Sequence, residues 1–489
     1  MNLEVSRREP ELEIHELDRR RRIRVLAICC LSLFIVGLDV TVVNVALPSI
    51  GSDLDTGISG LQWTVDAYTV VLASLLMFSG SVGDRFGRRR VFMVGLTLFV
   101  VASGLCSIAP NIESLVAFRV LQAVGASMLN PVALSIVTNT FTDPRERAQA
   151  IGAWASVFGI SMALGPVVGG ALVSALDWRA IFWINIPVGL AAILLTLRFV
   201  PESRAPRPRR FDPLGQVLVI VLLASLTSGI IEAPDRGWTS AATLATFALS
   251  AAALAGLLLH EPRRRDPLID LRFFRSVPFA SAAATAVAAF AAFGGFLFLN
   301  TLYLQEVRDL SPVQAGLAIL PMAAMTVLFA PISGRIVGHR GPRLPLAIGG
   351  GFLLAGCLML TDLQPDTPFA WLLAAYVVFG IGFGFVNAPI TNTAVSGMPR
   401  AQAGVAAAVT STSRTVGQTL GVALVGALVA SHIGDSADAE LAAASHVAWW
   451  TLTAAGAVVL GLAFLATTAR AHASAQRTAA ELNPEALLP

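Results

Sequence analysis

The sequence contains no lysine, so all 34 of its cationic side chains are arginines. A Walker A loop needs a lysine to bind phosphates, and an enzyme that forms a Schiff base needs a lysine amine. The absence therefore excludes P-loop ATPases and pyridoxal-phosphate enzymes. Charged residues make up only 13% of the chain, about half the share that is usual in soluble domains. This scarcity argues against a soluble protein.

Cysteine and histidine are scarce as well, with four and six copies among 489 residues. The cysteines, at positions 29, 30, 106 and 357, lie inside apolar runs and show neither a CxxC pair nor a disulfide framework. The histidines lie at the ends of such runs, in loops or in tails, and no HExxH motif occurs. We therefore expect no metal, no cofactor, no nucleotide or nucleic acid as a partner, and no enzymatic activity.

Apolar residues are abundant: they form 55% of the chain, and its mean hydropathy is +0.72. They gather in runs of about 20 residues or more, the length that an α-helix needs to cross a bilayer. The first run follows a long charged segment and has no small-residue cleavage site, unlike a secretory signal peptide. The sequence predicts an all-α, polytopic membrane protein.

Apolar runs bounded by charge, proline or glycine predict about fourteen transmembrane helices. The predicted spans are 24–47, 61–82, 91–109, 112–139, 148–175, 180–198, 213–232, 239–259, 278–304, 312–337, 344–361, 369–391, 402–431 and 446–468. The pair 213–232 and 239–259 is also compatible with one re-entrant unit.

Arginine alternates between the connections of these spans. Arginine-rich connections, such as 85–90 and 204–210, are followed by connections that are acidic or nearly uncharged. The positive-inside rule then places both termini in the cytoplasm, and this requires an even number of spans. Arginine without lysine, together with much alanine, is typical of a GC-rich bacterial genome. We therefore expect the cell (inner or plasma) membrane of a bacterium.

The order of the spans predicts two six-helix bundles with two additional helices between them. The expected segments are a cytoplasmic tail (1–23), a first bundle (24–198), a linker with two transmembrane helices (199–277), a second bundle (278–468) and a cytoplasmic tail (469–489). No connection is long enough to fold as a separate domain, so any function resides in the helices.

Two similar turns lie half a protein apart. The turn GSVGDRFGRRR (80–90) follows the second span, and a positive-inside loop explains its arginines but not the spacing of its glycines and aspartate. A degraded copy, GRIVGHRGPR (334–343), follows the tenth span with Gly338 in place of the acid. The pair indicates an internal repeat of the kind found in transporters.

With further motifs, these turns make the chain resemble the major facilitator superfamily and, within it, the fourteen-helix drug:proton antiporter branch. The motifs are LDVTVVNVALP (38–48), RVLQAVGAS (119–127) and SMALGPVVGG (161–170). Ala123 and Ser161 stand where the family usually has glycine. The resemblance covers residues 20 to 470 and implies the major facilitator fold, proton coupling and alternating access.

The resemblance also implies roles for two groups of residues. It gives a conformational latch to the first turn, at Gly80, Asp84, Arg85, Gly87 and Arg88. It gives an antiporter motif that seals the central cavity to the fifth span, at Gly165, Pro166, Gly169 and Gly170. Close packing of helices alone also accounts for the glycines of the fifth span.

Asp39 is a carboxylate inside an apolar run. An ionised aspartate at mid-bilayer costs about 2.5–3.5 kcal/mol, so we expect it to face a cavity or a partner. At about 1.5 Å per residue, Asp39 and Arg119 lie at similar depths, roughly 13 and 12 Å from the outer ends of their helices. The distance between them can then switch the protonation of the acid, as a proton-coupled cycle requires. A static ion pair that joins the two helices is the alternative.

Other polar residues in the spans are candidates for proton or substrate sites. Asp66 lies about 8 Å from the outer end of the second span, either as a second proton or cation site or as a polar residue of an outer vestibule. Candidates for a substrate cavity are Asn44, Gln122, Asn387 and Arg414. Hydrogen bonding between helices explains each of them as well.

These features predict a proton-driven exporter of antibiotics or other amphipathic, drug-like compounds that confers resistance. The drug, the proton and the lipid bilayer are its expected partners, and the proton gradient supplies its energy. Two alternatives are an importer or symporter of a small solute on the same fold, and a membrane receptor that does not transport. A receptor needs no acid in mid-membrane, so replacement of Asp39 distinguishes it from a transporter.

Overall fold

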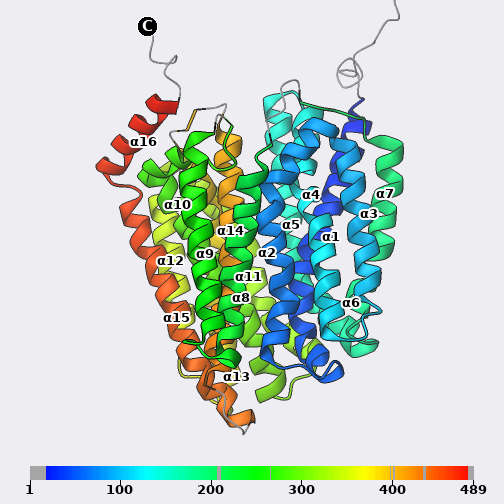
Figure 1. Cartoon of the computed structure of the whole chain (residues 1–489), viewed down its shortest axis with the longest axis vertical. Helices are drawn as coiled ribbons and strands as arrows, with labels where there is room; N and C mark the ends of the chain where they lie inside the picture. Colours follow the sequence, from blue (N-terminus) through cyan, green and yellow to red (C-terminus); the bar gives the residue numbers. More distant parts are fainter. Residues whose placement is uncertain are drawn as a thin grey trace, which may run out of the picture.

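The computed structural model describes residues 18–205, 211–264, 266–396, 398–399, 402–432 and 437–482. Throughout this part of the chain the regular structure is helical, and strands are absent. The long helices run nearly parallel to one another along the long axis of the molecule (Figure 1). This arrangement suits a protein whose helices cross a bilayer side by side.

Sixteen α-helices follow one another in the described chain. They are α1 (Arg19–Asp53), α2 (Ile58–Phe86), α3 (Arg88–Cys106), α4 (Ile112–Thr140), α5 (Pro144–Ala175), α6 (Ala180–Trp183), α7 (Asn185–Phe199), α8 (Pro213–Arg236), α9 (Ala241–His260), α10 (Val277–Leu302), α11 (Pro312–Arg340), α12 (Arg343–Leu358), α13 (Phe369–Val395), α14 (Ala403–Ala430), α15 (Ala437–Leu465) and α16 (Ala469–Leu482). A π-helical turn, Tyr303–Val307, continues α10.

Among the described residues, thirteen helical segments are long and apolar enough to cross a membrane, and α6 and α7 together form one of them. α12 is shorter, with 16 residues, and occupies the place of the predicted span 344–361. The start of α1 and the helix α16 lie at the same end of the molecule, at the top of Figure 1. A chain whose two ends lie on the same side of a membrane crosses it an even number of times. The thirteen segments meet this condition when α12 is counted as a further span. The total of fourteen and the cytoplasmic position of the termini stay predictions.

The helices form two bundles, α1–α7 and α10–α15, which we call the N-terminal and the C-terminal bundle (Figure 1). The additional helices α8 and α9 pack against each other, and α8 also packs against α2 of one bundle and α14 of the other. Each of the two additional helices is long enough to span the membrane. This length favours two separate spans over the alternative of one re-entrant unit, and the two spans stay a prediction.

Helix boundaries depart from the prediction mainly where helices continue past the apolar run. α15 begins at residue 437 rather than 446, and α1 begins at Arg19 rather than residue 24. Both extensions contain charged residues, which a search for apolar runs leaves out although the helix continues beyond the hydrocarbon. A further helix, α16, lies within the predicted C-terminal tail.

The two bundles meet near the end of the molecule that is opposite to the termini. Gln62, near the start of α2, donates a hydrogen bond of 2.8 Å from Nε2 to the carbonyl oxygen of Ala423 in α14. Near the end of α5, Ser174 Oγ accepts a hydrogen bond of 3.2 Å from the backbone N–H of Val313 in α11. The pairs α2–α14 and α5–α11 thus form the boundary between the bundles.

Candidate functional site

Asp39 of α1 and Arg119 of α4 form a buried ion pair. Arg119 Nη1 donates to Asp39 Oδ2 at 2.6 Å, and the two side chains are 0% and 1% exposed. Both lie within the N-terminal bundle rather than at its surface. Because an unpaired charge in this position is very costly, each side chain compensates the buried charge of the other.

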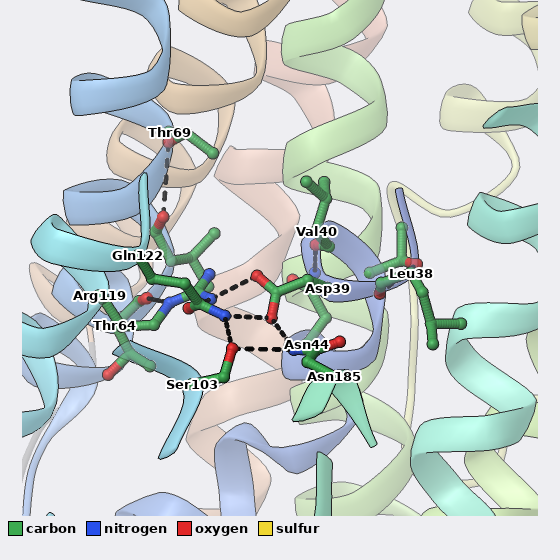
Figure 2. A network of polar contacts seen from close by, with 12 residues as sticks. Leu38, Asp39, Val40, Asn44, Thr64, Thr69, Ser103, Arg119, Gln122 and Asn185 are labelled. Carbon is green, nitrogen blue, oxygen red and sulfur yellow. Dashed lines mark hydrogen bonds and ion pairs between the residues drawn. The ribbon is translucent and has the colours of Figure 1, made fainter. Parts of the chain in front are cut away.

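Two amide side chains complete the surroundings of the Asp39 carboxylate (Figure 2). Gln122 Nε2 and Asn185 Nδ2 both donate to Asp39 Oδ1, at 2.9 and 3.0 Å. Both also reach Ser103 Oγ, at 2.8 and 3.4 Å. The Asp39 carboxylate of α1 therefore bonds to α4 and α7, and α3 joins this network through Ser103. All of the side chains involved are buried.

The Arg119 guanidinium is held by further contacts from α2 and from its own helix. Its Nε donates to the carbonyl oxygen of Thr64 at 3.1 Å, and its Nη1 donates to Gln122 Oε1 at 2.7 Å. The ring of Tyr68 lies 4.2 Å from the guanidinium carbon, a cation–π arrangement. The contacts with Thr64 and Tyr68 position the cation independently of the carboxylate, whereas Gln122 bonds to both charged groups.

Glycines of α5 allow this helix to pack closely against α1 of its own bundle and against α11 of the C-terminal bundle. A Cβ at Gly165 would overlap Thr41 of α1, and one at Gly169 would stand 2.7 Å from a methyl carbon of Val42. A Cβ at Gly170 would overlap the carbonyl group of Pro312 in α11. The carbonyl of Pro166 packs in turn against Gly316 of α11. The predicted antiporter motif therefore forms a close contact between α1, α5 and α11.

Asp66 of α2 is fully buried, and no ion pair reaches it within the described part of the chain. Thr69 Oγ1 donates to Asp66 Oδ1 at 3.3 Å, while Asp66 Oδ2 has no hydrogen-bond partner. Thr419 Oγ1 of α14 donates to Thr69 Oγ1 at 2.8 Å. Asp66 is thus one hydrogen bond removed from the boundary between the bundles.

The four residues predicted for a substrate cavity do not converge on one place. Gln122 belongs to the Asp39 network, and Asn44 donates to the carbonyl oxygen of Val40 in its own helix at 3.1 Å. In the C-terminal bundle, Arg414 Nη2 donates to the carbonyl oxygen of Asn387 at 3.2 Å. Arg414 and Asn387 therefore lie together, apart from the other two.

The surroundings of Arg414 combine one cation with polar and aromatic groups. Its Nη2 also donates to Thr391 Oγ1 at 2.6 Å, and the ring of Phe290 lies 5.7 Å from the guanidinium carbon. Phe290 contacts Phe383, which stacks on Phe293 at a centroid distance of 4.3 Å. No carboxylate among the described residues pairs with Arg414. The three phenylalanines are buried in this structure, and such a mixed set of side chains suits an amphipathic molecule.

The predicted latch residues gather at the turn between α2 and α3. Asp84 pairs with Arg88 at 2.8 Å, and Arg85 lies over the ring of Phe211 at 5.0 Å. Gly87 has a φ of +114°, a conformation that glycine adopts without strain. Gly80 packs against Pro131 of α4. Within the described chain, the Asp84 side chain has its contacts inside its own turn.

A charged cluster outside the spans joins the base of α8 to the end of α9. Asp212 caps α8 by accepting from the backbone N–H of Gly215 at 3.1 Å, and His260 Nε2 lies 2.9 Å from the same carboxylate oxygen. Burial on its own raises the pKa of Asp212. The His260 and Gly215 hydrogen bonds, with the nearby charge of Arg264, outweigh burial and hold this pKa below its ordinary value.

Sequence reasoning missed Ser103, Asn185, Thr64 and Tyr68. The available signal was weak: Asn185 is an amide inside an apolar segment, WINIPVG, and Ser103 is a small hydroxyl in the third span. Polar residues of this kind usually bond between helices, so their presence alone does not point to Asp39.

Among the described residues, no group of three His, Cys, Asp or Glu side chains is arranged to hold a metal ion.

Comparison with known proteins places this architecture among characterised relatives. The family model described as Major Facilitator Superfamily matches residues 29–422. "Multidrug resistance protein Stp" of Mycobacterium tuberculosis is 36% identical over 422 residues, which are 86% of this chain and 78% of that protein. "Tetracenomycin C resistance and export protein" of Streptomyces glaucescens is 38% identical, over 82% and 75% of the two chains. "Methylenomycin A resistance protein" of Streptomyces coelicolor is 35% identical, over 81% and 83%.

Two solved structures share the fold at low sequence identity. A bacterial homologue of the human lysosomal transporter Spinster, in an inward-facing and unoccupied conformation, has a TM-score of 0.63 and 17% identity, and the match covers 95% of this chain and 99% of that one. A D-xylose–proton symporter has a TM-score of 0.65 and 14% identity, with coverage of 91% and 97%. At such identities the likeness concerns the fold alone.

Proposed function

This chain belongs to the major facilitator superfamily, and we propose that it exports amphipathic, drug-like molecules in exchange for protons. It is a multi-pass bacterial membrane protein with the predicted all-α major facilitator fold, and it is a transporter rather than an enzyme. Relatives that are 35–38% identical to it are named for resistance to drugs or antibiotics, and one is named for export. These names support a drug as the substrate and resistance as the consequence.

One structural observation carries the proton-coupling part of the proposal: the Asp39–Arg119 pair lies beside the contact between α1 and α5. Residues 41–42 of α1 pack directly against the glycines of α5, and α5 packs through Gly170 against α11 of the C-terminal bundle. A movement between the bundles at α5–α11 therefore acts on α1 two residues from Asp39. Such a movement can change the distance between Asp39 on α1 and Arg119 on α4.

We assign the exchanged proton to Asp39 and its control to Arg119. While the pair is intact, the guanidinium and the two amides satisfy the carboxylate in its ionised form. When the pair separates, proton uptake removes the cost of an unpaired buried charge. Proton re-entry then supplies about 2.3 kcal/mol per 100 mV of membrane potential, without a cofactor.

Asp66 is the second acid in this proposal. It is buried beside Thr69, whose hydroxyl bonds to Thr419 across the boundary between the bundles. Opening of the α2–α14 contact brings Asp66 toward water, where it can exchange a proton or attract a cationic drug. Arg414, Asn387 and the neighbouring phenylalanines form the proposed drug-contacting surface of the C-terminal bundle.

The topology and the domain limits form part of the proposal. We place both termini and the turn 80–90 in the cytoplasm, with bundles at 24–198 and 278–468 and the two additional helices within 199–277. The alternation of arginine between connections supports this orientation. We also propose that Asp84 acts as a latch when the cytoplasmic ends of the bundles come together.

The experiment that tests the proposal is proton release from purified protein in weak buffer upon addition of ethidium or tetracenomycin C. We expect release from the wild type and its loss in Asp39→Asn. Glu113→Gln, which removes an exposed carboxylate in the first turn of α4, should release protons like the wild type. Drug binding, measured in parallel, shows that each variant is folded.

The other outcomes identify a different function or a different acid. Release that persists in Asp39→Asn and is lost in Asp66→Asn moves the exchanged proton to Asp66. Uptake of drug and protons in the same direction into proteoliposomes indicates a symporter. Drug binding without proton release or transport indicates a receptor and overturns the proposal.

A further inference from the structure

The turns after α2 and after α11 both begin at a glycine with a positive φ. Gly87 and Gly341 both adopt a positive φ, +114° and +75°, and each ends its helix. The N–H of Gly87 donates to the carbonyl of Gly83 at 3.1 Å, and the N–H of Gly341 donates to that of Val337 at 3.0 Å. Together with the similarity of the sequences at 80–90 and 334–343, these features make the two turns counterparts.

When these glycines are aligned, the charged residues of the first turn have no counterparts in the second. Gly338 stands in the place of Asp84, and Pro342 stands in the place of Arg88. The second turn thus lacks both members of the Asp84–Arg88 ion pair. It carries Arg335 instead, at the position of a serine in the first turn.

A second acidic residue binds the first turn, and no acidic residue of the described chain occupies the equivalent position at the second turn. Glu202, from the linker, accepts from the backbone N–H groups of Arg89 and Arg90 at 3.1 and 3.3 Å and pairs with the Arg90 side chain at 3.6 Å. Its carboxylate lies against Gly87. At Gly341, by contrast, a Cβ would meet no described atom within 4 Å.

The cations of the second turn are therefore left without acids. Within the described part of the chain, Arg335, Arg340 and Arg343 form no ion pair, although the arginines of the first turn do. Arg335, Arg340 and the neighbouring His339 are exposed. A Cβ at Gly338 would also stand in open space. Two exposed arginines and a histidine of this turn thus have no acidic partner among the described residues, while Arg343 lies 5.5 Å from the ring of Phe464.

The same turn carries a pocket of about 330 Å³ that is lined by Arg335, Ile336, His339, Arg340 and Leu344. Its cationic side chains sit at the end of a membrane-spanning helix, while Ile336 and the 41% exposed Leu344 give it an apolar wall. A phosphate group with an attached hydrocarbon chain matches both features. A small hydrophilic anion matches only the first.

We propose that this pocket binds the headgroup of an acidic phospholipid from the leaflet at the arginine-rich face of the protein. The phosphate supplies the negative charge that the Asp84 and Glu202 carboxylates supply at the first turn, and the acyl chain lies along Ile336 and Leu344. Basic pockets at the cytoplasmic ends of transmembrane helices favour acidic headgroups for this reason. The inference does not depend on which drug the protein exports.

The first test restores the missing acid. Native mass spectrometry of the detergent-purified protein is used to titrate phosphatidylglycerol against phosphatidylcholine. Gly338→Asp should weaken phosphatidylglycerol binding about fivefold, the effect of about one charge near the surface, without a steric cost. Gly338→Asn is nearly identical in size and should bind like the wild type. Equal binding by the two variants overturns the proposal.

The second test removes the cations. Arg335→Gln with Arg340→Gln should weaken phosphatidylglycerol binding further and leave phosphatidylcholine binding unchanged. The matched control removes two exposed arginines of α16 at the same end of the molecule, Arg470→Gln with Arg477→Gln (Figure 1). An equal loss in both double variants indicates general surface attraction and contradicts a site. Competition by glycerol 3-phosphate at equal potency contradicts a lipid as the occupant.

Discussion

Thr41 of α1 lies directly against Gly165 of α5, so closely that a Cβ at position 165 would stand 2.8 Å from the Thr41 Cβ. Real side chains do not approach to this distance, so only glycine fits while α1 and α5 keep their spacing. The contact lies two residues from Asp39. The spacing of these two helices and the position of the buried acid are therefore linked.

We expect Gly165→Ala to push α1 away from α5 and to lower drug transport. Overpacking of this kind costs about 1–3 kcal/mol, which thermal unfolding of the purified protein measures. Gly159→Ala is the control on the same helix, because a Cβ there meets nothing within 4 Å. It should transport like the wild type and, because alanine favours helix, be at least as stable. Equal behaviour of the two variants would show that the contact with Thr41 is dispensable.

Breaking the ion pair from one side should cost more than removing both charges. Asp39→Asn leaves Arg119 buried without its acid, and we expect about 3–5 kcal/mol of lost stability. The double variant Asp39→Asn/Arg119→Gln should lose less stability than either single variant, and a double-mutant cycle of unfolding measures the coupling. Glu146→Gln, which breaks the more exposed pair with Arg22, should cost less than about 1 kcal/mol. Additive losses at Asp39 and Arg119 would refute coupling between them.

Linking α5 to α11 should stop transport. Ser174 and Val313 meet at the end of the molecule opposite to the termini, where Ser174 Oγ and the Val313 backbone N are 3.2 Å apart. We expect a short thiol-reactive, cleavable cross-linker between Ser174→Cys and Val313→Cys to abolish drug transport in proteoliposomes. Cleavage of the linker should restore it, and the single-cysteine variants should be unaffected. Full transport by the cross-linked protein would show that the bundles do not separate at this contact.

Acid should remove the contribution of Asp212 to stability. Its folded-state pKa lies below the ordinary value, so its stabilising effect is present above a pH of about 4 and is lost as the pH falls through the folded-state pKa. The difference in unfolding temperature between the wild type and Asp212→Asn should therefore be largest near neutral pH and shrink below a pH of about 4. A difference that grows with acidity would reverse the assigned sign and contradict the contacts with His260 and Gly215.

Most of the fold was predictable because a bilayer imposes the length and composition of each span. The runs at 112–139 and 213–232 correspond closely to α4 and α8. Asp39 and Asp66, the acidic residues within the first two spans, were recognisable because a charge is costly in hydrocarbon. The family motifs added the fold and the class of substrate. The ends of α1 and α15 were less accessible, because a helix that leaves the hydrocarbon no longer needs apolar residues.

The candidate site was only partly predictable. Depth along the helices suggested Arg119 as a partner for Asp39, but depth does not reveal which face of a helix a residue occupies. Gln122 looked like a cavity residue for that reason, and Asn185 looked like one polar residue among many. Both bond to Asp39 only because α4 and α7 are rotated toward α1.

The sequence by itself determined that this is a polytopic membrane protein with an internal repeat and an acid in its first span, because transfer into hydrocarbon acts on each segment separately. The tertiary structure decided which polar groups meet, since helix rotation and spacing depend on close contacts such as Gly165 with Thr41. It also decided that Glu202 lies at the first turn while the pocket of the second turn has no acid. Such pairings join residues far apart in the chain, and the energy that selects them exists only once the helices are packed.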